Sequence, residues 1–350
     1  MPTSARMVAV AAHGLAGSRT DLPHEPLSEV EWFDLVQGCV AADLVGLLAA
    51  SAAGGHLPVT AGQAEELDVL AAEHAGLSAL VQRHAVTMAS LLEIAGIDHR
   101  IVDGPGRAIA YPDGGPTVRP VRRVRVLVPP QRLDEARALQ GVRPAVPDGP
   151  VSRHQRLVVV DTLPGLDPAP RADLPALLGP PTRVDLDGRS VPVLTLDQQL
   201  AVACAALSAT PVPALADLRD VAQLALAADV DARATRRLAD RLGVSDALAA
   251  GVAQAWTWFD LADKTELSVW AVRRAAPRVD RSAGRAASPG ARVGLAQRVL
   301  GRRPAAPAPV ADAAAVPSTS AGPPWSSGGV PVPSTAEGYG RPHRSTRRQP

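Results

Sequence analysis

Apolar side chains recur every three or four residues over two long stretches in the N-terminal part of the chain, a spacing typical of amphipathic helices. The first stretch begins at Ser28, where Glu31 three residues later completes the pattern of a capping box, and it ends at Gly54. The second begins at Thr60 and ends at Gly96. These signals predict a loose leader over residues 1–25 and an N-terminal helical segment over residues 26–96.

The middle of the chain changes to the shorter period of β-strands. Strand-like runs occur in "IDHRIVD", "VRRVRVLV" and "RLVVVD". The run "TRVDLDGRSVPVL" is typical of a hairpin, because Asp187 and Gly188 supply the positive backbone angles of a tight turn. Short helical runs follow Gly106 and fill "PPQRLDEARALQG". We therefore predict a small mixed β-sheet with accompanying helices over residues 97–195.

Helical spacing returns at Leu196 and lasts to about Arg274, with Asp197 as the expected N-cap of the first helix. Pro211 and Pro213 separate two of the helices. The chain then becomes rich in Pro, Ala, Ser and Gly, a composition that buries too little apolar surface to offset the entropy of ordering. The predicted fold class is α+β, with a helical segment over residues 196–275 after the sheet and a disordered tail over residues 276–350.

Composition and charge agree with a folded body and a basic tail. Hydrophobic residues make up 46% of the 350 residues, which is enough for a sizeable core. The formal net charge is only +1, but from Pro277 onward eleven arginines stand against three acidic residues, a net +8 that leaves about −7 on the rest. Among the possible partners, we expect nucleic acid to bind only through this basic tail.

The cysteines and the apolar runs exclude some classes of protein. Cys39 and Cys204 lie in apolar helical stretches without the spacing of a zinc site or a disulfide framework. The run from Leu35 to Ala50 contains Asp43 and is shorter than the roughly 20 residues of a membrane span. The N-terminus has too short an apolar run for a convincing signal peptide. We predict a cytoplasmic protein without a membrane span.

The segment of residues 97–130, "IDHRIVDGPGRAIAYPDGGPTVRPVRRVRVLVPP", carries the most informative chemistry. Alternation in its second strand places three valines on one face and Arg123 and Arg125 on the other. Gly104 lies in a turn between a strand and a helix, where backbone N–H groups can cradle a phosphate. An ordinary tight turn explains the same glycine.

This segment resembles the uncharacterised nucleotidyltransferase-like family of the DNA-polymerase-beta-type nucleotidyltransferase superfamily. In that family a strand ends in Lys-Gly, a short helix carries Tyr-Pro, Arg-Pro follows, and a second strand carries Asp-x-Asp-Leu-Leu-Val. The matching positions here are Gly104, Tyr111, Pro112, Arg119, Pro120, Leu127 and Val128. Asp103 stands at the lysine position, and Arg123 and Arg125 stand at the two aspartate positions. The likeness covers roughly residues 30–270 and includes "VVVDTLP", in which Asp161 matches a family aspartate.

The resemblance implies a nucleotidyltransferase-type sheet and a site that the family would use to hold Mg²⁺. Two aspartates at i and i+2 of a strand point to one side and supply the hard oxygen ligands that Mg²⁺ requires. Arginine offers donors only and stays protonated, so Arg123 and Arg125 cannot ligate a metal. We therefore expect no catalytic residue, no bound metal and no cofactor, and we expect Asp161 to pair with Arg123 or Arg125.

The resulting hypothesis is a catalytically degenerate protein whose remodelled pocket binds an anionic ligand, such as a nucleotide or a sugar phosphate, or holds a protein partner. The predicted binding residues are Gly104, Arg107, Arg119, Arg123, Arg125 and Asp161. Two alternatives stay open. One is an active Mg²⁺-dependent nucleotidyltransferase whose metal ligands are Asp103 and Asp161, and the other is a non-enzymatic scaffold with Arg123 and Arg125 in surface ion pairs.

Overall fold

The structure of the protein is a computed structural model. It describes residues 4–108, 110–111, 118–119, 121–141, 158–161, 174–210, 212–262 and 264–275. All of them belong to one unit of the chain, Met1–Val279. The second unit, Asp280–Pro350, and with it almost all of the tail for which we predict disorder, lies outside the described residues.

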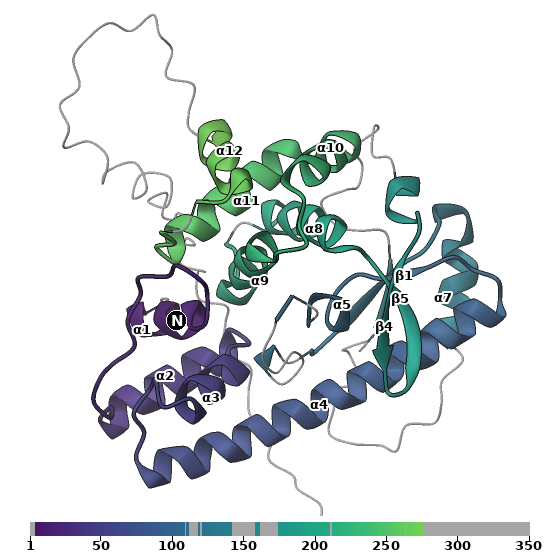
Figure 1. The fold of residues 1–350 in the computed structure, drawn as a ribbon. Coiled ribbons are helices and arrows are strands. Elements are labelled where there is room, and N and C mark those ends of the chain that lie inside the picture. The colour runs from purple at the N-terminus through teal and green to yellow at the C-terminus, as the bar shows by residue number, and fades with distance from the viewer. Residues whose placement is uncertain are drawn as a thin grey trace, which may run out of the picture. The chain divides into compact units, whose positions relative to one another are not determined.

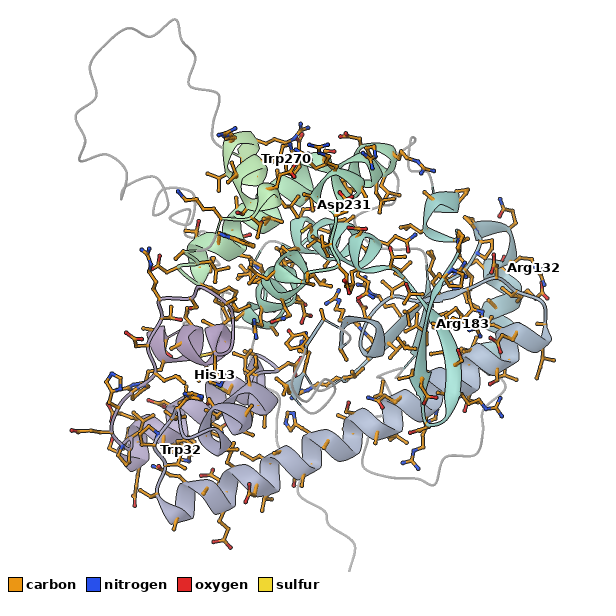
Figure 2. All side chains as sticks on the ribbon, in the orientation of Figure 1. His13, Trp32, Arg132, Arg183, Asp231 and Trp270 are labelled. Atoms are coloured by element: carbon orange, nitrogen blue, oxygen red, sulfur yellow. The ribbon has the colours of Figure 1, made fainter. Side chains whose placement is uncertain are left out.

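The N-terminal part of the fold is helical, as Figure 1 shows. Its helices are α1 (Ala5–Ala12), α2 (Glu29–Ala41), α3 (Val45–Ala53) and α4 (Ala61–Ile94). The backbone N–H of Ser28 donates to Glu31 Oε2 at 3.2 Å, and the backbone N–H of Thr60 donates to the side-chain oxygen of Gln63 at 3.0 Å. Both predicted helix starts are therefore confirmed as capping boxes. Trp32 of α2 donates to a carboxylate of α4 at 2.7 Å and ties the two helices together (Figure 2).

Two features of this part differ from the sequence prediction. Residues 1–25 are not simply a loose leader, because α1 buries Met7 and Val10 and packs against α3 and α9 (Leu215–Leu226). A helix this short is unstable alone, so its sequence gives a weak signal and its stability comes from tertiary packing. The run that begins at Ser28 is two helices, because Asp43 takes a left-handed φ of 58° between them.

A mixed β-sheet follows α4 and confirms the α+β fold class. Its elements in chain order are β1 (Arg100–Ile101), α5 (Pro105–Ala108), β2 (Val124–Leu127), η1 (Pro130–Arg132), α7 (Leu133–Gly141), β3 (Val158–Asp161), η2 (Leu174–Leu177), β4 (Thr182–Leu186) and β5 (Arg189–Val193). The strand order is β3-β2-β1-β5-β4. β2 runs parallel to β3 and antiparallel to β1, while β5 runs parallel to β1 and antiparallel to β4. The predicted hairpin turn is confirmed, since Asp187 and Gly188 have φ values of 52° and 74°.

One face of the sheet packs on the C-terminal half of α4. Val124 and Val126 of β2 are buried there together with Val193 of β5. Val81 and Leu92 of α4 are fully buried in the same cluster. Because side chains alternate along a strand, Arg125, which lies between Val124 and Val126, points to the opposite face of the sheet.

The chain ends its described part in a second group of helices. They are α8 (Leu196–Ser208), α9 (Leu215–Leu226), α10 (Ala232–Leu242), α11 (Ser245–Trp258) and α12 (Glu266–Ala275). The N-cap of α8 is Thr195 and not Asp197 as predicted, because the Thr195 hydroxyl accepts from the backbone N–H of Gln198 at 3.3 Å in a complete capping box. Asp197 instead accepts from the hydroxyl of Thr235 on α10 at 2.5 Å.

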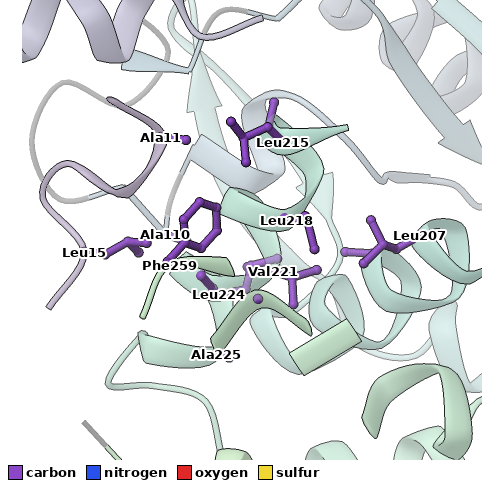
Figure 3. Packing of buried hydrophobic residues seen from close by; sticks show 14 of the residues in the cluster. Ala11, Leu15, Ala110, Leu207, Leu215, Leu218, Val221, Leu224, Ala225 and Phe259 are labelled. Carbon is purple, nitrogen blue, oxygen red and sulfur yellow. The ribbon is translucent and has the colours of Figure 1, made fainter. Parts of the chain in front are cut away.

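The main hydrophobic core joins the two helical groups. Figure 3 shows Phe259, which is fully buried, close to Leu15 and the α9 side chains Leu218 and Val221. Ala110, from the segment that follows α5, belongs to the same cluster, so the chain that leaves the central strand β1 packs against α9. Within the described ranges no helix is both long and apolar enough to cross a bilayer.

Candidate functional site

The candidate site begins where the chain leaves β1. Gly104 has a φ of +65°, and a Cβ atom there would lie 2.5 Å from Val121 Cγ1, so the turn requires glycine. Helix α5 starts directly after it and presents Arg107 one helical turn beyond Asp103. The tight turn therefore fixes an acidic and a basic side chain at the C-terminal end of β1, the central strand of the sheet.

Asp103 receives two guanidinium groups. Arg125 projects from the face of β2 opposite the buried valines, and its Nε and Nη2 atoms both donate to the Asp103 carboxylate, the latter at 2.9 Å. Arg107 Nη2 lies 2.8 Å from Asp103 Oδ1. The side chains of Arg125 and Arg107 are only 11% and 10% exposed, so these ion pairs are largely removed from water.

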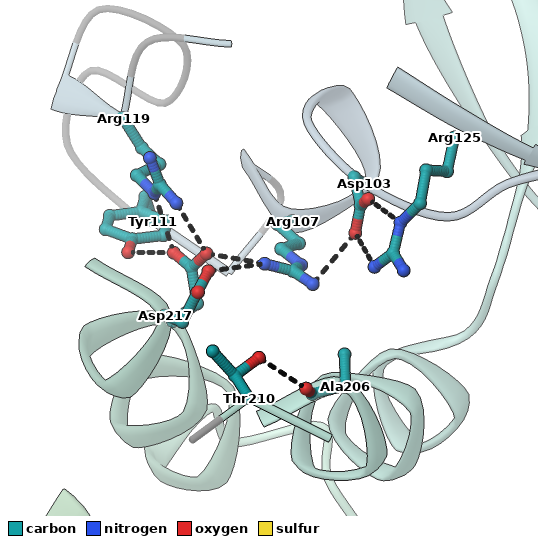
Figure 4. Close-up of polar contacts among 9 residues, drawn as sticks. Asp103, Arg107, Tyr111, Arg119, Arg125, Ala206, Thr210 and Asp217 are labelled. Atoms are coloured by element: carbon teal, nitrogen blue, oxygen red, sulfur yellow. Dashed lines mark hydrogen bonds and ion pairs between the residues drawn. The ribbon is translucent and has the colours of Figure 1, made fainter. Parts of the chain in front are cut away.

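Asp220 of α9 forms the second centre of the network, and its side chain is 1% exposed. Arg119 binds it through two donors, with Nε 3.0 Å from Oδ1 and Nη2 3.0 Å from Oδ2. Arg107 Nη1 donates to Oδ2 at 2.8 Å, and the Tyr111 hydroxyl donates to Oδ1 at 2.7 Å. Arg107 thus bridges Asp103 and Asp220 and connects the sheet to the C-terminal helices. Figure 4 shows Arg107 between Asp103 and the side chains of Tyr111 and Asp217.

The pKa values show that opposite charges outweigh burial at both carboxylates. Burial alone would raise the pKa of Asp220, but Arg119 and Arg107 hold it well below its usual value. The pKa of Asp103 is lowered in the same way, because its burial is outweighed by Arg107 and Arg125. Burial also opposes the charges of Arg107 and Arg119, yet the neighbouring carboxylates raise the pKa of both. Both carboxylates are therefore ionised at neutral pH.

Asp217 is a weaker member of the network. It lies one turn before Asp220 on α9, its side chain is 48% exposed, and its Oδ1 is 3.8 Å from Arg107 Nη1. Burial raises its pKa, and the nearby arginines only partly oppose that effect. With Asp217 included, three carboxylates balance the charges of Arg107, Arg119 and Arg125.

Most of the predicted binding residues meet here, Arg123 does not, and the side chain of Asp161 lies outside the described part of the structure. Gly104, Arg107, Arg119 and Arg125 all belong to the turn and network described above. Arg123 precedes β2, its side chain is exposed, and it makes no hydrogen bond or ion pair with a residue that the structure describes. The backbone of Asp161 pairs with Leu127 across the β2–β3 ladder, but its side chain lies outside the described part. The predicted pairing of Asp161 with Arg123 or Arg125 therefore lies outside the described part, and the partner that the structure gives Arg125 is Asp103.

Four members of the network were not among the predicted binding residues: Asp103, Tyr111, Asp217 and Asp220. Asp103 was predicted only as a metal ligand of the active-enzyme alternative, and Tyr111 only as part of the family pattern. Asp217 and Asp220 are three residues apart in "LADLRD", which places them on one face of a helix. That spacing is the signal from which the acidic side of the network could have been found.

The described residues do not form a metal centre. Within the ranges given above, no group of three or more His, Cys, Asp or Glu side chains is placed to hold an ion. The two most buried carboxylates, Asp103 and Asp220, already accept from arginines. A divalent cation at either carboxylate would lie beside guanidinium groups of the same charge sign.

Comparison with known families identifies the chain. Residues 28–260 match the model of a family described as uncharacterised nucleotidyltransferase. The chain belongs to this family. The match spans α2 to the end of α11, so it includes the sheet and most of both helical groups, whereas α1 and α12 lie outside it. No curated protein and no solved structure matches the chain.

Proposed function

We propose that this member of the nucleotidyltransferase family is catalytically degenerate, and that its arginine centre binds an anionic ligand without Mg²⁺. By arginine centre we mean the buried network of Arg107, Arg119 and Arg125 with their carboxylate partners. The observation that carries the proposal is the state of Asp103, whose two carboxylate oxygens accept from Arg125 and Arg107. A metal ion at Asp103 would have to displace both guanidinium groups. Arg107 would keep Asp220, but Arg125 would be left almost buried without its carboxylate, which is costly. The same arrangement opposes the alternative in which Asp103 and Asp161 serve as metal ligands.

A reciprocal exchange of charge supports the same interpretation. The family pattern that the sequence resembles has lysine at the position of Asp103 and aspartate at the position of Arg125. In this chain both signs are reversed, and the two side chains bond to each other. Reversal at both positions preserves the attraction between them but removes the carboxylate that would serve a metal. The exchange is therefore compatible with the family fold but leaves no carboxylate at the position of Arg125 to bind a metal ion.

Binding of an anion is favoured by donors that remain available at the centre. The Nε atom of Arg107 is buried and has no hydrogen-bond partner, although each of its Nη atoms is bonded. The contact between Arg107 and the half-exposed Asp217 is long at 3.8 Å, so a phosphate or carboxylate oxygen could replace it. Arg123, which directly precedes β2 and lies outside the network, offers a further exposed guanidinium. Nucleotides and sugar phosphates are the ligand class that fits these donors.

Calorimetric titration with ATP and with a sugar phosphate, each with and without Mg²⁺, tests this proposal together with an assay of pyrophosphate release. We expect affinity that does not depend on Mg²⁺, and no pyrophosphate release with any acceptor. The variant Arg123→Gln should weaken binding, whereas Arg132→Gln, an exposed arginine paired with Glu135, should not. Affinity that requires Mg²⁺, together with pyrophosphate release, would identify an active enzyme. Absence of all binding would favour the scaffold alternative.

A further inference from the structure

Helix α10 presents a basic face away from the core. Arg233, Arg236 and Arg237 follow the spacing i, i+3 and i+4, which gathers them on one side of the helix. The opposite side buries Ala239 and Leu242. The last turn of α12 adds further arginines beside this face, and Figure 2 shows Trp270 of α12 among these side chains. The network around Asp103 and Asp220 uses none of them.

Two adjoining hollows of about 350 and 600 Å³ lie between α10 and α12 and share Arg236, Trp270 and Arg274. Together we call them the α10–α12 groove. The cationic side chains that line it are Arg233, Arg236, Arg237, Lys264, Arg273 and Arg274. Only two acidic residues, Asp240 and Glu266, line it among the described residues. Asp246 of α11 also neutralises Arg274, at 2.9 Å, so the groove keeps a surplus of about three positive charges.

The surplus charge is carried by side chains that point into solvent. Arg236 and Arg274 are engaged by Glu266 and Asp246. Arg237, Lys264 and Arg273 are exposed and form no salt bridge with a residue that the structure describes. Their donors are therefore available to a ligand with several negative charges.

Trp270 gives the groove an aromatic surface between arginines. The guanidinium carbons of Arg236 and Arg274 each lie 5.8 Å from the centroid of the Trp270 ring, which is the geometry of a cation–π contact. Aromatic rings next to a line of arginines are the combination that binds single-stranded nucleic acid, because bases stack on the ring while phosphates take the charge. An acidic peptide would use the charges but would have no use for the ring.

We propose that the α10–α12 groove binds single-stranded nucleic acid through its phosphodiester backbone. Arg237, Arg273 and Lys264 contact phosphates, and Trp270 with its two arginines supports a base. The residues after α12 continue the positive charge in the sequence, with a net +8 from Pro277 onward. This proposal extends beyond the basic tail, to which the sequence alone confined nucleic acid, and it does not depend on the function proposed for the arginine centre.

Fluorescence anisotropy of the full chain with a labelled oligothymidylate of about 20 nucleotides tests the groove directly. The variant Arg237→Gln with Arg273→Gln removes two exposed charges without breaking a described ion pair. We expect roughly tenfold weaker binding at physiological salt, and a slope of log affinity against log salt that is less steep by about 1.4. The control is Arg183→Gln with Arg189→Gln on the β4–β5 hairpin, which changes the net charge equally. It also breaks the half-exposed ion pair of Arg183 with Glu93, and it should leave both the affinity and the salt slope unchanged.

Several outcomes would overturn the proposal. One is the absence of oligonucleotide binding by the wild-type protein. Another is undiminished binding by the Arg237 and Arg273 variant, because the tail would then account for the affinity. A third is an equal loss of affinity in the test and control variants, which would indicate a general charge effect. Polyglutamate that competes as well as unlabelled oligothymidylate would show that the groove takes acidic chains of any kind. Thermal melting of both variants verifies that each is folded.

Discussion

The substitution Asp220→Asn tests whether the buried network holds the C-terminal helices to the sheet. Asparagine keeps the volume of the side chain but removes the negative charge that Arg119 and Arg107 share. Arg107 keeps Asp103 as a partner, whereas Asp220 is the carboxylate that Arg119 contacts. The cost therefore falls chiefly on the Arg119 guanidinium, which is 15% exposed.

Loss of one partner from a buried ion pair costs about 3–5 kcal/mol, because the remaining charge is left in a medium of low dielectric constant. For a unit of this size that free energy corresponds to a fall in Tm of roughly 5–9 °C. Asp217→Asn is the matched control, since it makes the same chemical change one turn earlier on α9 and also faces Arg107. Its long, half-exposed contact predicts a loss of about 1 kcal/mol or less.

These free energies are measured by thermal and urea unfolding. The proteins compared are the wild type, the two single variants and the double variant Asp220→Asn with Arg119→Gln. The double variant should be hardly less stable than Asp220→Asn, because it removes the charge that the single variant leaves unpaired. The lowered pKa of Asp220 also determines how the stability difference changes with pH. Its contribution to stability is full above the unfolded pKa of about 3.9 and is lost as pH falls through the lower folded value. The gap between wild type and variant should therefore narrow in acid, and equal stabilities for Asp220→Asn and Asp217→Asn at neutral pH would refute this reasoning.

Three further predictions concern single features of the fold. Gly104→Ala should destabilise the protein by about 2–4 kcal/mol in urea unfolding, because the new Cβ meets Val121, whereas Gly188→Ala has the same positive φ in open space and should cost only about 1 kcal/mol. The exchange Asp103→Arg with Arg125→Asp should recover part of the stability lost by either single change, and a purely additive loss would argue against their ion pair. Burial lowers the pKa of His99, so its contribution to stability is full above the unfolded pKa of about 6.5 and is lost as pH falls below it. His99→Gln should therefore flatten the dependence of unfolding free energy on pH below about 6.5.

The sequence predicted those parts of the fold whose causes are local. The capping box at Ser28, the helix start at Thr60 and the Asp187 turn depend on side chains within three residues of one another, and each appears as expected. Helix α1 escaped prediction because its stability depends on packing against residues far along the chain. The left-handed conformation of Asp43, which splits the first helical run, gave no signal in an otherwise uninterrupted apolar pattern.

The candidate site was predictable in its arginines and not in their partners. Alternation along the strand correctly set Arg125 apart from the buried valines. The partner of Arg125 is Asp103, 22 residues away, and that of Arg107 is Asp220, 113 residues away. The first contact depends on the pairing of β2 with β1, and the second on the packing of α9 against the segment after β1. No local pattern specifies either. The expectation that Arg123 would join them treated an exposed residue before the strand as a member of it.

The central claim is that guanidinium groups occupy the place of a divalent cation beside Asp103. Titration of the wild-type protein with Mn²⁺, followed by electron paramagnetic resonance, tests it most directly, because Mn²⁺ accepts the same oxygen ligands as Mg²⁺ and its free form gives a strong signal. The claim predicts that the signal of the free ion is undiminished by the protein. Stoichiometric loss of that signal, restored by Asp103→Asn, would contradict it.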